Sequence, residues 1–435
     1  MKKIIILMGV LFLIGCSEDT PTSNQNISSE IAFTLCEGSF QANDASLHGL
    51  NEDALLLVTG DTGSSMAVYN NQLLVVNNGS SNVVIYNIST EGIVEYASTI
   101  ELNGSSPREI LLVGDKAYIS QWVALSIAVI DLKTLSVEQI EMPGCTEGLT
   151  TDDTYLYTTI KYLNNTDWPY PAGNTIEKIN LSTNLIENSF SVSNNPDIVI
   201  YHNGFLFVGS QYGDWPTYNF VTEKINPITG ELSASKDHGS DVAFGVDFSI
   251  HNDVLYRAYD KGIVALNDDL SVNISTYIGT EYSGLYSMAI NEDSIYLGFG
   301  DYTAPDNVII IDFNGNEIGN YEVGTSPGSF AFWTPVTIRY SDQDELGHIN
   351  NCSYIAYVEA GRVAFLGGLL DPVRHAGIDF ILAHIAVDYL KEGHYPGTIN
   401  VGSRILRLGN KSMTTGYGLF IDNEVGGATA TGVGE

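Results

Sequence analysis

The sequence has few positive charges. It holds 18 Lys and Arg against 52 Asp and Glu, which gives a formal net charge of −34. This surplus of negative charge repels nucleic acid, which is therefore excluded as a partner. Residues 334–435 carry a net charge of only −4, whereas the residues before them carry −30. The split predicts two domains of separate origin, the second able to admit an anionic ligand.

Cysteine is scarce and charged residues are not abundant. The four cysteines, Cys16, Cys36, Cys145 and Cys352, are irregularly spaced, so they form neither a disulfide framework nor a metal site. A Cys36–Cys145 bridge and a pair of unbonded core thiols both remain open. The chain is 44% hydrophobic and only 16% charged, which excludes global disorder. We expect no metal and no cofactor.

Long hydrophobic runs are also lacking, apart from one near the N-terminus. Lys2 and Lys3 precede an apolar run from Ile4 to Ile14, which is too short for a membrane-spanning helix. The run ends in Leu-Ile-Gly-Cys16, which resembles a bacterial lipobox. This resemblance implies a signal peptide over 1–16, lipidation of Cys16, a flexible tether over 17–30 and a lipid-anchored protein of the cell envelope, at the outer membrane or surface. The alternative is a plain signal peptide with an incidental cysteine.

A two-strand pattern recurs six times in the first three quarters of the chain. Its copies begin near residues 73, 117, 155, 205, 254 and 295, which are 38 to 50 apart. Most copies follow a turn rich in Asn, Asp or Gly, such as His202-Asn203-Gly204. This spacing fits four short strands per repeat, the period of a β-propeller blade.

Two fragments remain outside the six repeats. They run from Ile31 to Val58 and from Ser326 to Trp333, and neither is long enough for a blade. Together they predict a seventh blade in which the last strand closes the ring and removes exposed strand edges. We therefore expect an all-β, seven-bladed propeller over 31–333, with six or eight blades as alternatives. In its style of repeat the region resembles the YncE-like bacterial surface propellers.

Prolines and loop aromatics add two expectations for the propeller. Pro107, Pro196 and Pro327 recur in similar frames and mark the start of a blade's first strand. Aromatic residues gather in two long loops: Trp168, Tyr170, Trp215 and Tyr218. These loops either bind a ligand or protein that the sequence does not identify, or only pack at the rim.

The pattern changes after Trp333. A short strand, Val336–Tyr340, and a polar turn come before Asn350-Asn351, which can cap a helix. A helical stripe then follows at Tyr354, Val358, Gly361 and Phe365, and the remaining sequence favours strands over Phe380–Leu390, Thr398–Leu408 and Ser412–Ile421. This order predicts an α+β domain over 334–435, a helix wrapped by an antiparallel sheet.

The residues of this region carry a more specific resemblance. The segment Arg339–Asn351, with Tyr354, Tyr357, Glu359 and Arg362, resembles the signature of the 4-hydroxybenzoyl-CoA thioesterase family. Val387–Leu390, Arg407–Ser412 and Ala430-Thr431-Gly432 are similar to strands of that family, in the same order. The resemblance implies a hotdog fold, hydrolysis of acyl-CoA thioesters and a homodimer.

The resemblance also implies roles for individual residues. Asp344 falls at the catalytic position, where it activates water or attacks the thioester directly. The backbone amide of Asn351, at the start of the helix, polarises the thioester oxygen. His348 either orients Asp344 or only forms a hydrogen bond within its loop. We expect three substrate-binding residues, Arg407, Lys411 and Ser412. The charges of Arg407 and Lys411 suit the CoA phosphates, and the alternative is that these two residues lie on a solvated strand edge.

Two features conflict with a simple thioesterase. A lipid anchor places the protein outside the cytoplasm, whereas acyl-CoA is made inside. The sequence ends just after Ala430-Thr431-Gly432, which opens the final strand in the family, so the last strand is expected to be cut short. The alternative function is a non-enzymatic, surface-exposed binding lipoprotein. In that case the thioesterase segment is incidental, or it was joined to the propeller by misreading two neighbouring frames.

Overall fold

The computed structural model describes most of the first 333 residues and parts of the C-terminal region. The described ranges are 31–51, 55–89, 92–166, 168–213, 218–240, 248–303, 305–333, 348–358, 382–390, 392–393, 399–408, 413–421 and 424–434. Within them, no helix is long and apolar enough to cross a membrane.

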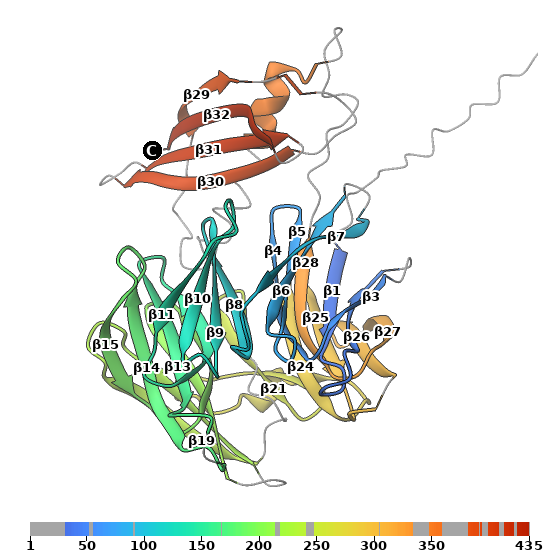
Figure 1. Cartoon of the computed structure of the whole chain (residues 1–435), viewed down its shortest axis with the longest axis vertical. Coiled ribbons are helices and arrows are strands. Elements are labelled where there is room, and N and C mark those ends of the chain that lie inside the picture. The colour runs from blue at the N-terminus through green and yellow to red at the C-terminus, as the bar shows by residue number, and fades with distance from the viewer. Residues whose placement is uncertain are drawn as a thin grey trace, which may run out of the picture.

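The strands up to Trp333 form seven four-stranded antiparallel sheets arranged in a ring (Figure 1). Blade 1 contains β4 (Gly63–Tyr69), β5 (Gln72–Asn77), β6 (Asn82–Ile88) and β7 (Val94–Glu101). Blade 2 contains β8 (Pro107–Val113), β9 (Lys116–Gln121), β10 (Ser126–Asp131) and β11 (Val137–Glu141). Blade 3 contains β12 (Cys145–Thr151), β13 (Tyr155–Tyr162), β14 (Ala172–Asn180) and β15 (Leu185–Ser191).

The other four blades follow the same plan. Blade 4 contains β16 (Pro196–His202), β17 (Phe205–Tyr212), β18 (Asn219–Ile225) and β19 (Leu232–Gly239). Blade 5 contains β20 (Phe248–His251), β21 (Val254–Tyr259), β22 (Gly262–Ala265) and β23 (Ile278–Gly279), with a short 3-10 helix at Ile274–Thr276. Blade 6 contains β24 (Leu285–Asn291), β25 (Ser294–Phe299), β26 (Asp306–Asp312) and β27 (Glu317–Val323). Blade 7 combines β28 (Pro327–Trp333) with β1 (Ile31–Cys36), β2 (Ala45–Gly49) and β3 (Leu56–Gly60).

Blade 7 closes the ring as the sequence predicts. β28 pairs antiparallel with β1, from Ile31 opposite Trp333 to Cys36 opposite Pro327, and the two strands lie side by side in Figure 1. The Trp333 indole N–H also donates a hydrogen bond to Asn71 Oδ1 in blade 1 at 3.2 Å. The two ends of the propeller sequence therefore share one sheet, and the prediction of seven blades is confirmed.

The core of the propeller consists of seven apolar layers, one between each pair of neighbouring blades. Successive residues of a strand point to opposite faces. Leu73 and Val75 of β5 consequently face blade 7, whereas Leu74 and Val76 face blade 2. Both faces of each blade's second and third strands are covered, which explains the continuous hydrophobic runs of the repeat.

First strands lie next to one another around most of the ring, so they line its axis. β8, β16 and β28 are first strands of this kind, and they begin at Pro107, Pro196 and Pro327 respectively. The prediction that these prolines open first strands is confirmed. Pro lacks an N–H donor, so it fits the first residue of a strand.

The propeller cysteines are free thiols. Cys36 and Cys145 are both buried and unbonded, in blades 7 and 3, so the alternative of a bridge between them is wrong. Burial raises the pKa of Cys36 to about 12 and that of Cys145 to about 11. A thiol with such a pKa stays protonated and unreactive at neutral pH.

The described part of the C-terminal region is a helix packed on a four-stranded antiparallel sheet. The helix covers residues 351–358. The strands are β29 (Leu382–Tyr389), β30 (Ile399–Leu408), β31 (Met413–Ile421) and β32 (Glu424–Gly434). Their order in the sheet is β29-β32-β31-β30. Three of these strands match those expected from the sequence, and the α+β arrangement is confirmed; the expected strand at Val336–Tyr340 lies outside the described residues.

The helix is held to the sheet by a compact apolar cluster. Buried Tyr354, Tyr357 and Val358 of the helix pack with Ile399, Tyr417 and Leu419 of the strands. One expectation needs correction, because Ala430-Thr431-Gly432 does not open the last strand. β32 begins at Glu424, and Ala430 lies inside it, between Val387 on β29 and Tyr417 on β31.

Candidate functional site

The helix of the C-terminal domain begins with a well-formed N-cap. The side-chain oxygen of Asn350 accepts a hydrogen bond from the Cys352 backbone N–H at 2.8 Å. Its backbone carbonyl accepts bonds from the N–H groups of Ser353 and Tyr354, at 2.8 and 3.3 Å. Asn350 is therefore the cap, and Asn351 is the first helical residue.

This geometry determines what Asn351 can offer a substrate. The N–H groups in the first turn of a helix have no carbonyl four residues earlier to receive them, and they lie at the positive end of the helix dipole. An amide in this position can donate to an oxygen on which negative charge develops. One well-placed donor of this kind lowers a reaction barrier by about 3 kcal/mol.

A tyrosine from the sheet fixes the start of the helix. The Tyr389 hydroxyl at the end of β29 donates to the Asn351 carbonyl at 3.2 Å. Its ring meets the Tyr354 ring edge to face, with centroids 5.4 Å apart. Sequence reasoning did not assign Tyr389 this role, because a contact between residues 38 positions apart requires the strand and helix to be packed first.

His348 lies two residues before the cap and pairs with a residue that the sequence did not indicate. Its Nε2 lies 3.4 Å from Glu392 Oε2, and 36% of its side chain is exposed. Next to it, the Ile349 N–H donates to the Gly393 carbonyl at 2.7 Å. These two contacts hold residues 348–349 against residues 392–393. The expected contact between His348 and Asp344 stays a prediction, since Asp344 lies outside the described residues.

Of the remaining residues expected at the thioester site, the structure describes the backbone position of Arg407 only. Arg407 is on β30, opposite Thr414 of β31. Lys411 and Ser412 fall outside the described residues, as does Cys16 near the N-terminus. Their roles stay predictions. No group of His, Cys, Asp and Glu side chains in the described ranges could hold a metal ion.

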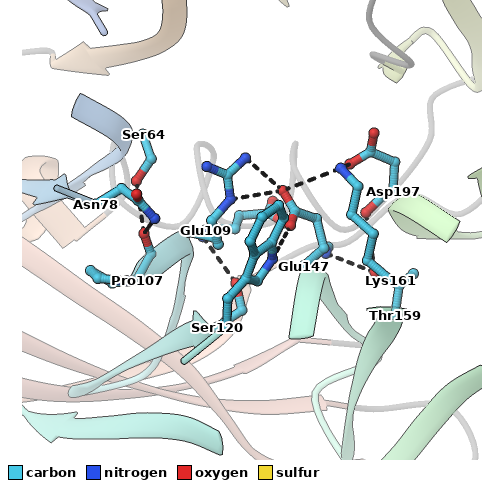
Figure 2. Close-up of polar contacts among 12 residues, drawn as sticks. Ser64, Asn78, Pro107, Glu109, Ser120, Glu147, Thr159, Lys161 and Asp197 are labelled. Atoms are coloured by element: carbon cyan, nitrogen blue, oxygen red, sulfur yellow. Dashed lines mark hydrogen bonds and ion pairs between the residues drawn. The ribbon is translucent and has the colours of Figure 1, made fainter. Parts of the chain in front are cut away.

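The propeller contains a second set of polar residues, here called the axial cluster: Arg108, Trp122, Glu147, Lys161 and Asp197. The Arg108 guanidinium donates twice to Glu147 Oε1, at 2.9 and 3.0 Å. The Trp122 indole N–H donates to the other oxygen of Glu147. Lys161 Nζ lies 2.8 Å from Asp197 Oδ1 and 3.9 Å from Glu147 Oε1. Figure 2 shows Glu147 facing Lys161, which in turn reaches Asp197.

The cluster lies at one end of the propeller axis. Arg108, Glu147 and Asp197 are the second or third residues of the first strands β8, β12 and β16. Burial alone would raise the pKa of the Glu147 carboxyl, but the Arg108 and Lys161 charges hold it below its usual value. One feature of the sequence could have indicated this site. Arg108 and Asp197 directly follow the repeated prolines Pro107 and Pro196, which open first strands.

Two further side chains reach the cluster's surroundings from other blades. The Tyr286 hydroxyl of blade 6 donates to Glu37 Oε1 at 2.7 Å. Burial raises the pKa of the Glu37 carboxyl, against the opposing effects of Tyr286 and Arg108. Glu37 follows β1, so blades 6 and 7 also contribute to this end of the axis.

A row of aromatic rings runs from the axial cluster to the surface. Ring centroids are 5.2 Å apart between Trp122 and Tyr162, 5.3 Å between Tyr162 and Tyr170, and 5.1 Å between Tyr170 and Trp168, all edge to face. Trp168 is 81% exposed. Two of the four loop aromatics singled out in the sequence thus join this row, and Trp215 lies outside the described residues.

One open depression lies elsewhere, on blade 5. It has a volume of about 720 Å³ and is lined by residues of β21 and the segment after β22, including Asp268, Asp269 and Asn273. None of the described residues that line it is a lysine, arginine or histidine. We therefore assign it no chemistry.

Comparisons with known proteins match the two parts of the chain separately. Residues 338–434 match the family model of the thioesterase-like superfamily. A thioesterase from Thermus thermophilus, solved with coenzyme A and Zn, is 29% identical, with a TM-score of 0.22 over 23% of this chain and 79% of that chain. No curated protein matches the chain.

Solved structures similar to the propeller are more distant in sequence. A candidate 6-phosphogluconolactonase from Bacteroides fragilis has a TM-score of 0.51 at 14% identity, covering 71% of this chain and 99% of that chain. A protein of unknown function from Desulfotomaculum acetoxidans has a TM-score of 0.52 at 12% identity, covering 71% and 100%. At such identities the similarity shows the fold alone. The chain thus combines a seven-bladed β-propeller with a thioesterase-like domain.

Proposed function

We propose that the C-terminal domain hydrolyses an acyl-CoA thioester to the free acid and CoA. The observation that carries this proposal is the capped helix start at Asn351, inside a segment that matches the thioesterase-like superfamily. A thioesterase needs a donor fixed in place before the reaction begins, and the cap, Tyr389 and the apolar cluster fix this one.

The reaction follows from the chemistry of thioesters. Asp344 takes a proton from water, whose oxygen attacks the thioester carbon, or Asp344 attacks that carbon itself and the resulting anhydride is then hydrolysed. In both routes the amide of Asn351 stabilises the negative oxygen. The carbon–sulfur bond breaks, and the CoA sulfur leaves and takes up a proton. Arg407 and Lys411 would bind the CoA phosphates.

The test is hydrolysis of acyl-CoA esters by the whole chain. The free acid is measured by mass spectrometry, since the exposed thiol of Cys352 would react with thiol reagents. Asp344→Asn should abolish turnover. Asp342→Asn is the matched control, because it removes a carboxylate two residues away in the sequence while leaving Asp344 in place. Equal activity in the two variants and the natural chain would rule out Asp344 as the catalytic group.

A second candidate function is binding at the cell surface, with Cys16 as the lipid anchor. The exposed Trp168 and its aromatic row favour it, because a large exposed ring next to a fixed polar network is typical of a binding surface. A radiolabelled fatty acid should enter the natural chain in a bacterial host but not the Cys16→Ser variant. Equal labelling of the natural chain and the Cys16→Ser variant would exclude Cys16 as the anchor.

A further inference from the structure

The axial cluster contains none of the residues assigned to thioester hydrolysis, and its charged pairs are a weak source of stability for the propeller. Paired charges taken out of water are often no better for stability than apolar residues of the same size. Here Glu147 alone gathers two cations and an indole N–H. Such a network suits a role in recognition, where fixed side chains add specificity.

The four charges of the cluster balance one another. Arg108 and Lys161 are matched by Glu147 and Asp197, at 2.9 and 2.8 Å. A ligand with a net charge would have to compete with one of these pairs. The carboxylates of Glu147 and Asp197 would repel an anion. The charges of Arg108 and Lys161, which lie 4.8 and 5.6 Å from the centre of the Trp122 ring, would repel a cation. The cluster therefore favours an uncharged ligand with many polar groups.

The charged side chains of the cluster are partly exposed. The exposed fractions of its charged side chains are 29% for Arg108, 11% for Glu147, 13% for Lys161 and 24% for Asp197. Both carboxylates keep further acceptor positions, and the ammonium keeps further donor positions. Hydroxyl groups both donate and accept hydrogen bonds, so a polyhydroxylated ligand can use all of these groups at once.

The aromatic row supplies the apolar half of the same site. Trp168 is 81% exposed although its ring is large and apolar. The face of an aromatic ring carries partial negative charge, so it attracts the weakly positive C–H groups of a saturated ring. A sugar ring has one face of C–H groups and a rim of hydroxyls. A chain of several sugar rings therefore matches the row and the cluster together.

We propose that the axial cluster and the Trp122–Trp168 aromatic row form a binding site for neutral carbohydrate. Trp168 stacks on a sugar ring at the surface. Glu147, Lys161 and Asp197 bind the hydroxyls of the sugar that reaches the axis. The site serves binding alone and does not depend on the thioesterase activity of the C-terminal domain.

The proposal is tested by affinity electrophoresis of the whole chain in gels that contain starch, xylan, galactomannan, mixed-linkage β-glucan or dextran. At least one of these neutral polysaccharides should retard the natural protein. Trp168→Ala should weaken that retardation at least tenfold, and Asp197→Asn should weaken it as well. Trp168 is exposed, so its replacement should leave the fold intact, which circular dichroism would check.

Ile228→Ala is the matched control. Ile228 is an exposed apolar residue, 84% exposed, in the turn between β18 and β19, at the opposite end of its blade from the axial cluster. Its replacement should leave binding unchanged. Retardation by none of the five polysaccharides would overturn the proposal. So would equal binding by Trp168→Ala, or retention only by anionic pectin or alginate that disappears in 0.5 M NaCl.

Discussion

His238 shows how the interior of the propeller responds to protons. Its ring nitrogen lies 3.0 Å from the Thr222 hydroxyl, to which the buried Arg257 guanidinium also donates at 2.8 Å. Burial and the Arg257 charge lower the pKa of His238 to about 4. Lys236 lowers it a little further, and Asp237 acts in the opposite direction. The folded protein therefore keeps this ring neutral well below neutral pH.

This pKa predicts a pH dependence of stability. Between pH 6.5 and about 4 the unfolded chain binds a proton at His238 that the folded chain does not bind. The free energy of unfolding should therefore fall as the pH drops through this window, by about 3 kcal/mol in all. Urea titrations from pH 7 to 4 would measure the slope. His238→Gln should flatten it, and identical slopes would exclude His238 as its source.

The cap of the C-terminal helix gives a second prediction for a single residue. Asn350→Ala removes the acceptor for the Cys352 N–H and should destabilise the C-terminal domain by about 1 kcal/mol. Asn350→Asp keeps an acceptor and adds a favourable charge at the helix start, so it should fold as well as the natural chain. Thermal melts of the whole chain would compare the three. A domain insensitive to Asn350→Ala would show that the cap is unimportant.

At the scale of elements, the closing strand should be essential to the propeller. Trp333 ends β28, is only 3% exposed and packs in the layer between blades 7 and 1. Trp333→Ala should cost about 4 kcal/mol through the lost burial and the cavity left behind. Trp333→Phe, which keeps most of the ring, should cost clearly less. Guanidinium titration of both variants would test this, and equal small losses would mean that closure contributes little.

The elements could be predicted well because each blade repeats a local pattern. Runs such as Leu73–Val76 are buried on both faces, and turns such as His202–Gly204 bound them. Local sequence therefore contains most of the information that places a strand. The last strand, β32, begins before Ala430 because Gly426 and Gly427, which weaken the strand signal in the sequence, are nevertheless part of it.

The sites could be predicted only in part, because most of their residues are far apart in the sequence. Asn350 and Asn351 were found because a cap is a local motif. The axial cluster joins Arg108 to Glu147 and Lys161 to Asp197, pairs that are 39 and 36 residues apart. Only the curvature of the ring brings them together. The contact between Tyr389 and Asn351 likewise depends on the packed domain.

At the scale of the whole molecule, the chain joins two parts of different charge and chemistry. The propeller is strongly acidic, and residues 334–435 are close to neutral. If the two parts are made as one protein, native cells should contain a peptide that crosses Trp333 and Val336. Mass spectrometry of such cells distinguishes the fused protein from two separate products, because separate products would yield no such peptide.

The most direct test of the central claim is the kcat/KM of the whole chain for acyl-CoA esters, compared with that of Asp344→Asn. The account predicts measurable hydrolysis by the natural chain and a loss of at least about 100-fold in the variant, since the loss of a general base typically costs 10²- to 10⁴-fold. Hydrolysis at the same rate in both proteins, or no hydrolysis of any acyl-CoA by the natural chain, would contradict it.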